Sequence, residues 1–279
     1  MNNLYQDICA ELAPLYDERE ARALARIVIE DVMHLSFTKA MAGLCGEMSA
    51  EQMRTLSDTM ARLKRHEPIQ YIIGGTEFCD LPIKVNSSVL IPRPETEQLV
   101  EIATTVLDGE CPVRVMDACT GSGCIAVAVK SLRPKWEVSA CDISAGALET
   151  ARLNAELNNA EISFSQFDLL TGEFPAGRYD MIVSNPPYVM NKEKATMSSN
   201  VLEYEPSVAL FVDDDNPLVF YKALASWGQL ALGKGGVLLV EINHLLADET
   251  MEVFVAQGYA GVKAVDDCFG KPRFVICRK

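Results

Sequence analysis

Short apolar runs alternate with helical patterns from residue 113 to the end of the chain. Runs with the length and composition of β-strands occupy residues 113–118, 136–142, 162–168, 179–185 and 235–242. Helical patterns occupy intervening segments such as 143–159 and 216–232. This alternation predicts an α/β fold with a mostly parallel sheet, whose crossovers are right-handed and whose ligands bind beyond the carboxyl ends of the strands.

The last two apolar runs have a much shorter connection. Residues 262–267 and 273–278 are separated only by the segment CFGKP. We therefore expect these two runs to form an antiparallel hairpin at one edge of the sheet.

The first 68 residues carry a helical pattern instead. Asp17 with Glu20, and Ser49 with Gln52, have the spacing of a capping box, which marks the start of a helix. Apolar side chains then recur at helical intervals through residues 53–63 before Pro68 ends the pattern. The sequence thus predicts a small helical domain ahead of the sheet.

The segment 69–93 differs from both neighbours. It contains the pair Gly74-Gly75, alternating apolar positions and two prolines, which favour a short β-hairpin used as a connector. Pro94 suits the first position of the helix that follows. We expect three parts: a helical domain over 1–68, a hairpin linker over 69–93 and the α/β domain over 94–279.

Composition and charge narrow the classes of partner. The chain has 279 residues, of which 49% are hydrophobic and 23% charged, as expected for one large and one small globular domain. Its formal net charge is −14 at pH 7, and no cluster of Lys and Arg stands out. This acidity disfavours nucleic acid as a partner and favours basic proteins, although it also suits a protein that is merely kept soluble.

Membrane and metal sites are not indicated. Asp7, Glu11 and Asp17 interrupt the N-terminal stretch where a signal peptide would be apolar, and no 18 apolar residues run together. The nine cysteines show no C-x-x-C spacing, and the three histidines lie far apart. We therefore expect a cytoplasmic protein with reduced thiols and without a metal site.

A glycine-rich loop follows the first strand of the α/β domain. In DACTGSGCIA, residues 117–126, Gly121 and Gly123 allow a tight turn against a ligand at the start of a helix. Asp142 stands 19 residues after Gly123, at the end of the second strand, where a carboxylate can accept both hydroxyls of a ribose. The same pattern fits a nicotinamide dinucleotide, so a dehydrogenase stays open at this point.

The motif SNPPYV, residues 184–189, follows the fourth strand and reaches the same end of the sheet. The Asn185 side-chain oxygen and the Pro186 carbonyl can each accept one N–H of a planar nitrogen and aim it at an electrophile. Pro186 and Pro187 fix the backbone before the substrate arrives. Tyr188 can stack on a planar group. This arrangement predicts transfer to an amide or aromatic amine.

Together the two motifs resemble the class I S-adenosylmethionine-dependent methyltransferases that act on planar nitrogens. PIQYIIGGTEF (68–78), LIPRPETE (90–97) and YEPSVAL (204–210) extend the resemblance to the protein glutamine methyltransferases that modify peptide chain release factors. The resemblance covers essentially the whole chain. It implies a Rossmann-like sheet, S-adenosylmethionine as cofactor, and methylation of the glutamine amide nitrogen in the Gly-Gly-Gln loop of a release factor.

The resemblance also implies roles for individual residues. The catalytic residues would be Asn185, Pro186, Pro187 and Tyr188. The cofactor-binding residues would be Cys119, Thr120, Gly121, Ser122, Gly123, Asp142, Asp168, Leu169 and Asn185. The helical domain would hold the body of the release factor. Two departures stand out: Cys119 occupies a position where some relatives have glycine, and Asn243 occupies one where glycine is common.

Other functions stay open beside this one. A related branch methylates a glutamine of a large-subunit ribosomal protein, although residues 93–97 match the release-factor branch better. A nucleic-acid amino-methyltransferase would use a similar NPPY motif on a flipped base, but it would need a basic surface. A dehydrogenase or a binding module would leave the NPPY motif without a purpose.

Overall fold

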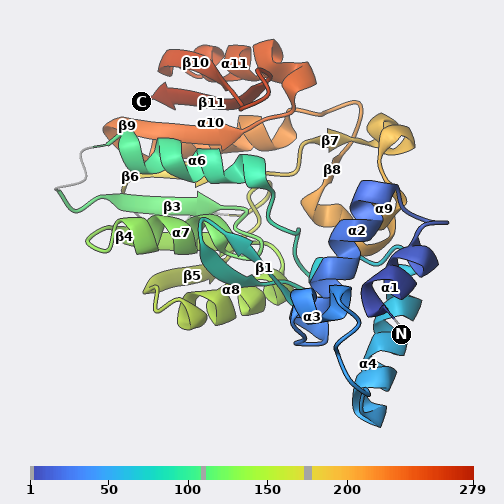
Figure 1. Ribbon diagram of the computed structural model, residues 1–279. Helices are drawn as coiled ribbons and strands as arrows, with labels where there is room; N and C mark the ends of the chain where they lie inside the picture. Colours follow the sequence, from blue (N-terminus) through green and yellow to red (C-terminus); the bar gives the residue numbers. More distant parts are fainter. Residues whose placement is uncertain (1–2, 108–110, 173–177) are drawn as a thin grey trace. The chain divides into compact units, whose positions relative to one another are not determined.

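The computed structural model describes residues 3–107, 111–172 and 178–279, which Figure 1 shows as helices and strands. By their contacts these residues form two units. The first unit contains the described residues up to Gly74 together with Ser198–Tyr204. The second contains the described residues of Gly75–Met197 and Glu205–Lys279. The division into 1–68, 69–93 and 94–279 stays a prediction.

The first unit is helical. Its elements are α1 (Leu4–Leu12), α2 (Glu18–Ile27), a π-helical turn (Val28–Val32), α3 (Phe37–Met41), α4 (Ala50–Leu63), α5 (Ile69–Ile73) and α9 (Ser199–Tyr204). Asp17 caps α2 by accepting the N–H of Glu20, which is one half of the predicted capping box, and Ser49 with Gln52 forms a complete capping box on α4 as the sequence predicts. Leu12, Ile29 and Leu63 are almost fully buried in its apolar core.

Helix α9 belongs to this first unit although it lies far along the chain. The hydroxyl of Tyr204 donates a hydrogen bond to the carbonyl of Arg65, with an O···O distance of 2.8 Å. Nothing in the local sequence of 198–204 indicates this association, because it depends on a contact between residues 139 positions apart.

The second unit begins with the hairpin that the sequence predicts. Strands β1 (Gly75–Phe78) and β2 (Leu81–Lys84) pair antiparallel, and helix α6 (Pro94–Thr105) follows with Pro94 in its first turn. The remaining elements are β3 (Arg114–Ala118), α7 (Cys124–Leu132), β4 (Glu137–Asp142), α8 (Ala145–Leu157), β5 (Ile162–Gln166), β6 (Tyr179–Ser184), β7 (Val189–Met190), a 3₁₀ helix (Asn191–Thr196), another (Ser207–Ala209), β8 (Phe211–Val212), α10 (Val219–Ala231), β9 (Leu232–Glu241), a third 3₁₀ helix (His244–Leu246), α11 (Ala247–Ala256), β10 (Ala260–Asp266) and β11 (Pro272–Arg278).

Seven strands form one sheet in the order β10-β11-β9-β6-β3-β4-β5. The pairs β3·β4, β3·β6, β4·β5 and β6·β9 are parallel, whereas β11 runs antiparallel to β9 and β10. The predicted α/β fold with a mostly parallel, Rossmann-like sheet and an antiparallel edge hairpin is therefore confirmed. A separate short pair, β7·β8, lies outside this sheet and was not predicted.

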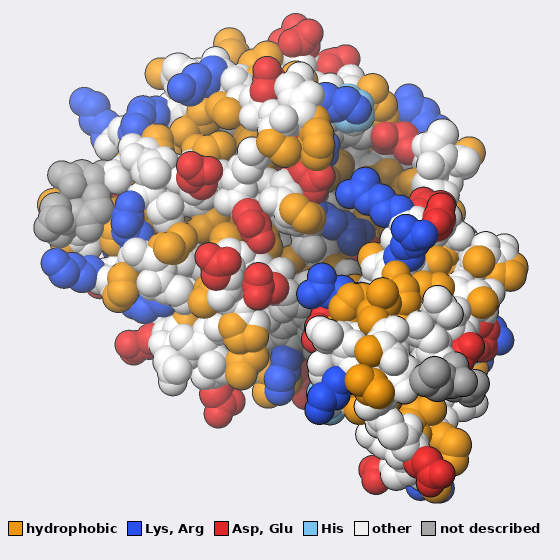
Figure 2. Space-filling view, viewed as in Figure 1, with side chains coloured by type: hydrophobic (Ala, Val, Ile, Leu, Met, Phe, Trp, Pro, Cys, Tyr) orange, Lys and Arg blue, Asp and Glu red, His pale blue; other side chains and the backbone are white. Residues whose placement is uncertain are grey.

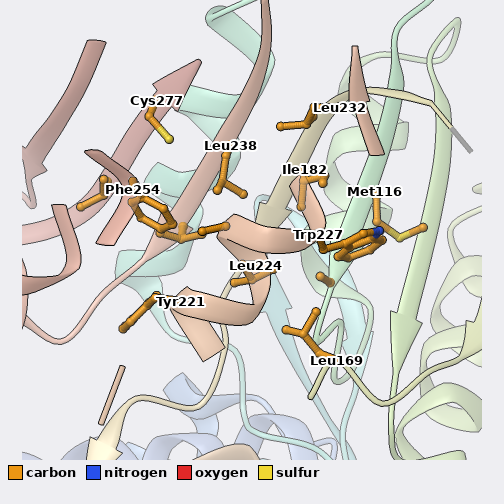
Figure 3. Packing of buried hydrophobic residues seen from close by; sticks show 14 of the residues in the cluster. Met116, Leu169, Ile182, Tyr221, Leu224, Trp227, Leu232, Leu238, Phe254 and Cys277 are labelled. Atoms are coloured by element: carbon orange, nitrogen blue, oxygen red, sulfur yellow. The ribbon is translucent and has the colours of Figure 1, made fainter. Parts of the chain in front are cut away.

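Helices cover both faces of the sheet. Helices α6, α7 and α8 lie along one face, and α10 and α11 pack on the other (Figure 1). Figure 3 shows Leu224 and Trp227 of α10 beside apolar side chains of β3, β6 and β9, labelled Met116, Ile182 and Leu238. These side chains are 0–1% exposed, so the layer between α10 and the sheet forms a continuous core that holds the strand ends in place.

The order of strands determines where a ligand can bind. From β3 the chain first builds β4 and β5 on one side and then returns to place β6 on the other side. The loops that leave β3 and β6 therefore diverge at the carboxyl edge of the sheet, which is the usual binding crevice of open parallel sheets.

The acidic character of the chain is visible on the second unit. Glu77, Asp80, Glu97 and Glu101 are exposed on the β1–β2 hairpin and α6. Figure 2 shows acidic side chains at the surface in this region, with basic and apolar side chains between them.

Candidate active site

A cavity of about 280 Å³ lies at the carboxyl edge of the sheet, within the second unit. Its size is close to the lower end of the range of small-molecule sites, about 300–1,000 Å³. Most of the predicted site residues line it, namely Cys119, Thr120, Gly121, Ser122, Asp142, Asp168, Leu169, Asn185 and Pro187. The other three predicted site residues, Gly123, Pro186 and Tyr188, are not among the described residues that line the cavity.

The glycine-rich loop adopts the backbone conformation that its sequence predicts. Gly121 has a φ angle of +55° and Gly123 one of +79°, both in the left-handed region that favours glycine. A Cβ atom on Gly123 would lie 2.9 Å from the Cβ of Ala151 in α8. Gly123 therefore allows the loop to pack closely against α8, which explains why it is needed without lining the cavity.

Cys119 also has a positive φ angle, +58°, although it carries a side chain. This φ angle lies in the left-handed region, so the cysteine bears a conformational cost there.

Asp142 holds the glycine-rich loop through the backbone. One carboxylate oxygen accepts the N–H of Gly121 and the other accepts the N–H of Ser144, both at 2.9 Å. Burial raises the pKa of Asp142, and these backbone N–H groups act in the opposite direction. A carboxylate has about four acceptor positions, so both oxygens can still accept a hydroxyl from the cavity.

The loop after β5 gives the cavity a second carboxyl group and apolar walls. Asp168 accepts the N–H of Leu170 at 2.9 Å and the hydroxyl of Thr171, and the bond from Thr171 is the main reason that its pKa is lowered. Ile143 and Leu170 line the cavity although they are 48% and 44% exposed. Exposed apolar side chains at a cavity can take the faces of a flat ring.

Asn185 is anchored through its amide nitrogen. Its Nδ2 atom donates to the hydroxyl oxygen of Thr96 in α6, with a distance of 3.3 Å. The Thr96 hydroxyl in turn donates to a carboxylate oxygen of Glu241, at 2.8 Å. The sequence indicates no role for Thr96 or Glu241, although Thr96 lies in LIPRPETE and Glu241 in the apolar run 235–242.

Tyr188 belongs to the same network. Its hydroxyl donates to the second carboxylate oxygen of Glu241 at 2.9 Å. Burial and the neighbouring Glu241 raise the pKa of Tyr188, so the hydroxyl stays protonated and can donate. The phenol is therefore fixed by the end of β9, and its predicted stacking against a substrate stays a prediction.

Asn243 forms hydrogen bonds with the segment that follows β6, at the end of the NPPY motif and just beyond it. Its Nδ2 atom donates to the carbonyl of Tyr188 at 3.2 Å and to Glu193 at 2.8 Å. Its Oδ1 atom accepts the N–H of Leu245 at 3.0 Å. The Asn243 side chain thus links the segment after β6 with the segment after β9.

An ion pair with a buried carboxylate joins the two remaining motifs, residues 90–97 and 204–210. The side chain of Glu205 is 1% exposed and accepts from Arg93 at 2.5 Å and from the N–H of Ile91 at 3.1 Å. It connects LIPRPETE with YEPSVAL, and Arg93 and Val208 from these motifs line the cavity. The sequence does not reveal that Arg93 and Glu205 pair, because they are 112 positions apart, although it indicates each motif separately.

Comparison with known families assigns both parts of the chain. Residues 97–205 match the family model described as methyltransferase small domain, and residues 3–74 match that described as PrmC N-terminal domain. A release factor glutamine methyltransferase of Bacteroides thetaiotaomicron is 38% identical over 100% of both chains. One of Neisseria gonorrhoeae is 37% identical over 92% of both chains.

Solved structures are similar in fold. The hMettl16 catalytic domain in complex with a MAT2A 3′UTR hairpin gives a TM-score of 0.58 at 18% identity, over 82% of this chain and 80% of that one. A methyltransferase from Pyrococcus furiosus gives 0.54 at 18% identity, over 80% and 98%. Across the described parts of the chain, no helix has the length and apolarity to cross a membrane.

Proposed function

The chain belongs to the family of release factor glutamine methyltransferases, and we propose that it methylates the side-chain amide nitrogen of a glutamine in a peptide chain release factor, using S-adenosylmethionine. The observation that carries this proposal is the cavity itself. It joins the loop of Gly121, the carboxylate of Asp142 and the amide of Asn185 at one edge of the sheet.

The residues that line the cavity fit S-adenosylmethionine. Asp142 offers acceptors for the two ribose hydroxyls, and the Gly121 loop leaves the backbone open to close approach. Ile143, Leu169 and Leu170 offer apolar surface to a flat base. When bound, the cofactor supplies an electrophilic methyl group.

Asn185 and Pro186 would orient the nucleophile. An amide nitrogen is a weak nucleophile because its lone pair is delocalised into the carbonyl group. Acceptors at Asn185 Oδ1 and the Pro186 carbonyl would each hold one N–H and stabilise the positive charge that develops as the N–CH₃ bond forms and the methyl–sulfur bond of the cofactor breaks, with S-adenosylhomocysteine as the leaving group. The nitrogen then loses one proton to water, so this chain needs no general base.

The proposed substrate is a protein rather than a nucleic acid. A glutamine side chain presents the planar NH₂ group that two acceptors can hold, and the net charge of −14 favours basic protein surfaces. We propose that the helical first unit holds the body of the release factor. Release factors act in translation, which suits a cytoplasmic enzyme.

The test is methyl transfer to intact proteins, measured by mass spectrometry. Purified enzyme and S-adenosylmethionine are expected to add one methyl group to a release factor, at the glutamine of its Gly-Gly-Gln loop. The matched control is the same factor with that glutamine replaced by alanine, which should gain none. Methylation of DNA or of a large-subunit ribosomal protein, with none of the release factor, would overturn the proposal.

A further inference from the structure

We infer that Thr96 is a positioning residue, which uses Glu241 to fix the amide of Asn185 with its oxygen available to the substrate. This inference rests on the proposed function, because the substrate amide is what Asn185 Oδ1 would receive. It adds two residues to the machinery, one on α6 and one at the end of β9, that the NPPY motif does not contain.

The orientation follows from counting hydrogens. A threonine hydroxyl has one hydrogen to donate and can otherwise only accept, whereas an ionised carboxylate can only accept. The 2.8 Å contact between Thr96 and Glu241 therefore uses the hydrogen of Thr96. The oxygen of Thr96 is left as an acceptor, and the 3.3 Å contact with Asn185 must come from the Nδ2 donor.

The reverse orientation of Asn185 would be unfavourable. It would place Oδ1 against the Thr96 oxygen, so that two acceptors would face each other without a hydrogen between them. Holding Nδ2 on Thr96 leaves Oδ1 on the other branch of the amide. Since Asn185 lines the cavity, Oδ1 can then accept an N–H from the substrate.

The Glu241 carboxylate is fixed in place, so it can keep the hydroxyl hydrogen of Thr96 directed toward itself. It is 2% exposed, and its second oxygen is occupied by the Tyr188 hydroxyl at 2.9 Å. Burial raises the pKa of Glu241, while the hydrogen bonds from Thr96 and Tyr188 and the charge of Arg273 favour its ionised form. Two donors and one nearby cation thus face this carboxylate, and Glu95 is the acidic group nearby.

Substitution of Thr96 separates positioning from packing. Thr96→Val keeps the volume but removes the hydroxyl, and should lower kcat for release-factor methylation by about tenfold or more, below the 10²–10³ scale of a directly contacting group. The Kd for S-adenosylmethionine and the KM for the release factor should stay within about twofold. Thr96→Ser restores the hydroxyl and should return kcat to within about threefold of the wild type.

Thr104 provides the matched control. It is a second buried threonine on α6, whose hydroxyl donates to the Val100 carbonyl within the helix at 2.8 Å. Thr104→Val should leave kcat unchanged. If Thr96→Val keeps the wild-type kcat, or if Thr96→Ser fails to restore it, the inference is wrong.

A measurement on the wild-type enzyme covers the case in which Thr96→Val does not fold. In side-chain NMR spectra, the Nδ2 protons of Asn185 should exchange with water more slowly than those of the exposed Asn159. Equally fast exchange would overturn the inference. This readout needs no substrate, so it still tests Thr96 if the wild-type enzyme methylates no release factor and the proposed function fails.

Discussion

Two carboxyl groups, Asp142 and Glu241, end two parallel strands of the same sheet and differ in what they hold. Asp142 ends β4 and accepts two backbone N–H groups, from Gly121 and Ser144. Glu241 ends β9 and accepts two side-chain hydroxyls, from Thr96 and Tyr188. Burial is the largest cause of a raised pKa in both.

The difference in partners separates their expected roles. Asp142 shapes a loop and lines the cavity, so its remaining acceptor positions face a ligand. Glu241 is 2% exposed, and its two oxygens hold Thr96, which contacts the first residue of the NPPY motif, and Tyr188, which is the last. A carboxyl group at a strand end can thus bind a ligand directly or fix other side chains, and its partners distinguish these cases.

Asn185 lies between the two carboxyl groups and gives the largest expected effect. Asn185→Ala should lower kcat by about two to three orders of magnitude, the scale for one preorganised polar group, while the fold stays intact. Steady-state methylation of a release factor measures the change, and circular dichroism checks the fold. Asn159→Ala, at an exposed position outside the site, is the control for turnover and should leave kcat unchanged, although the φ angle of +52° at this position makes the alanine variant somewhat less stable. Near-normal turnover of Asn185→Ala would remove this residue from the mechanism.

Measurements of cofactor affinity test whether Asp142 and Glu241 differ in role. Asp142→Ala should weaken binding of S-adenosylmethionine by about 1.5–3 kcal/mol, because charged hydrogen bonds to the ribose are lost. This corresponds to about a 10- to 150-fold rise in Kd by calorimetry. Glu241→Gln should leave that Kd within about twofold, because Glu241 does not appear among the described lining residues. Equal losses in the two variants would show that the two carboxyl groups do not differ in role.

The sequence predicts the fold of this chain more completely than its site. The apolar side chains of β3, β4, β6 and β9 are mostly buried, and Pro94 with its first-turn acids begins α6 as expected. Such signals are local, so a pattern along the chain reveals them. The association of α9 with the first unit has no local signal, because it depends on contacts with distant residues.

The same physical reason explains what was missed in the site. Glycine and proline motifs identify the cavity because they restrict their own backbone. The network around Glu241 joins residues 145 positions apart, from Thr96, and 53 apart, from Tyr188. An acid at the end of the buried run GGVLLVEI was a usable signal, since β9 lies beside β6 in the sheet. Its partners could only be found in the folded structure.

A third strand-end carboxyl group, Asp117 on β3, extends the comparison through the pH dependence of stability. One of its oxygens accepts both the Thr120 hydroxyl at 2.5 Å and the N–H of Ala126 at 3.2 Å. The side chain is fully buried, and burial raises its pKa from 3.8 to about 7. The folded state therefore binds a proton that the unfolded chain releases above about pH 4.

The sign of the effect follows from that difference. The protonated Asp117 contributes stability that is complete below the unfolded pKa of 3.8 and is lost as the pH rises to about 7. Asp117→Asn keeps an acceptor for Thr120 and Ala126 but cannot ionise. Relative to the wild type, its free energy of unfolding in urea should rise between pH 5 and pH 7, by up to about 1.4 kcal/mol per pH unit. Above pH 7 the difference should become constant. A difference that does not change between pH 5 and pH 7 would mean that Asp117 is already ionised in the folded protein, so that its partners outweigh its burial.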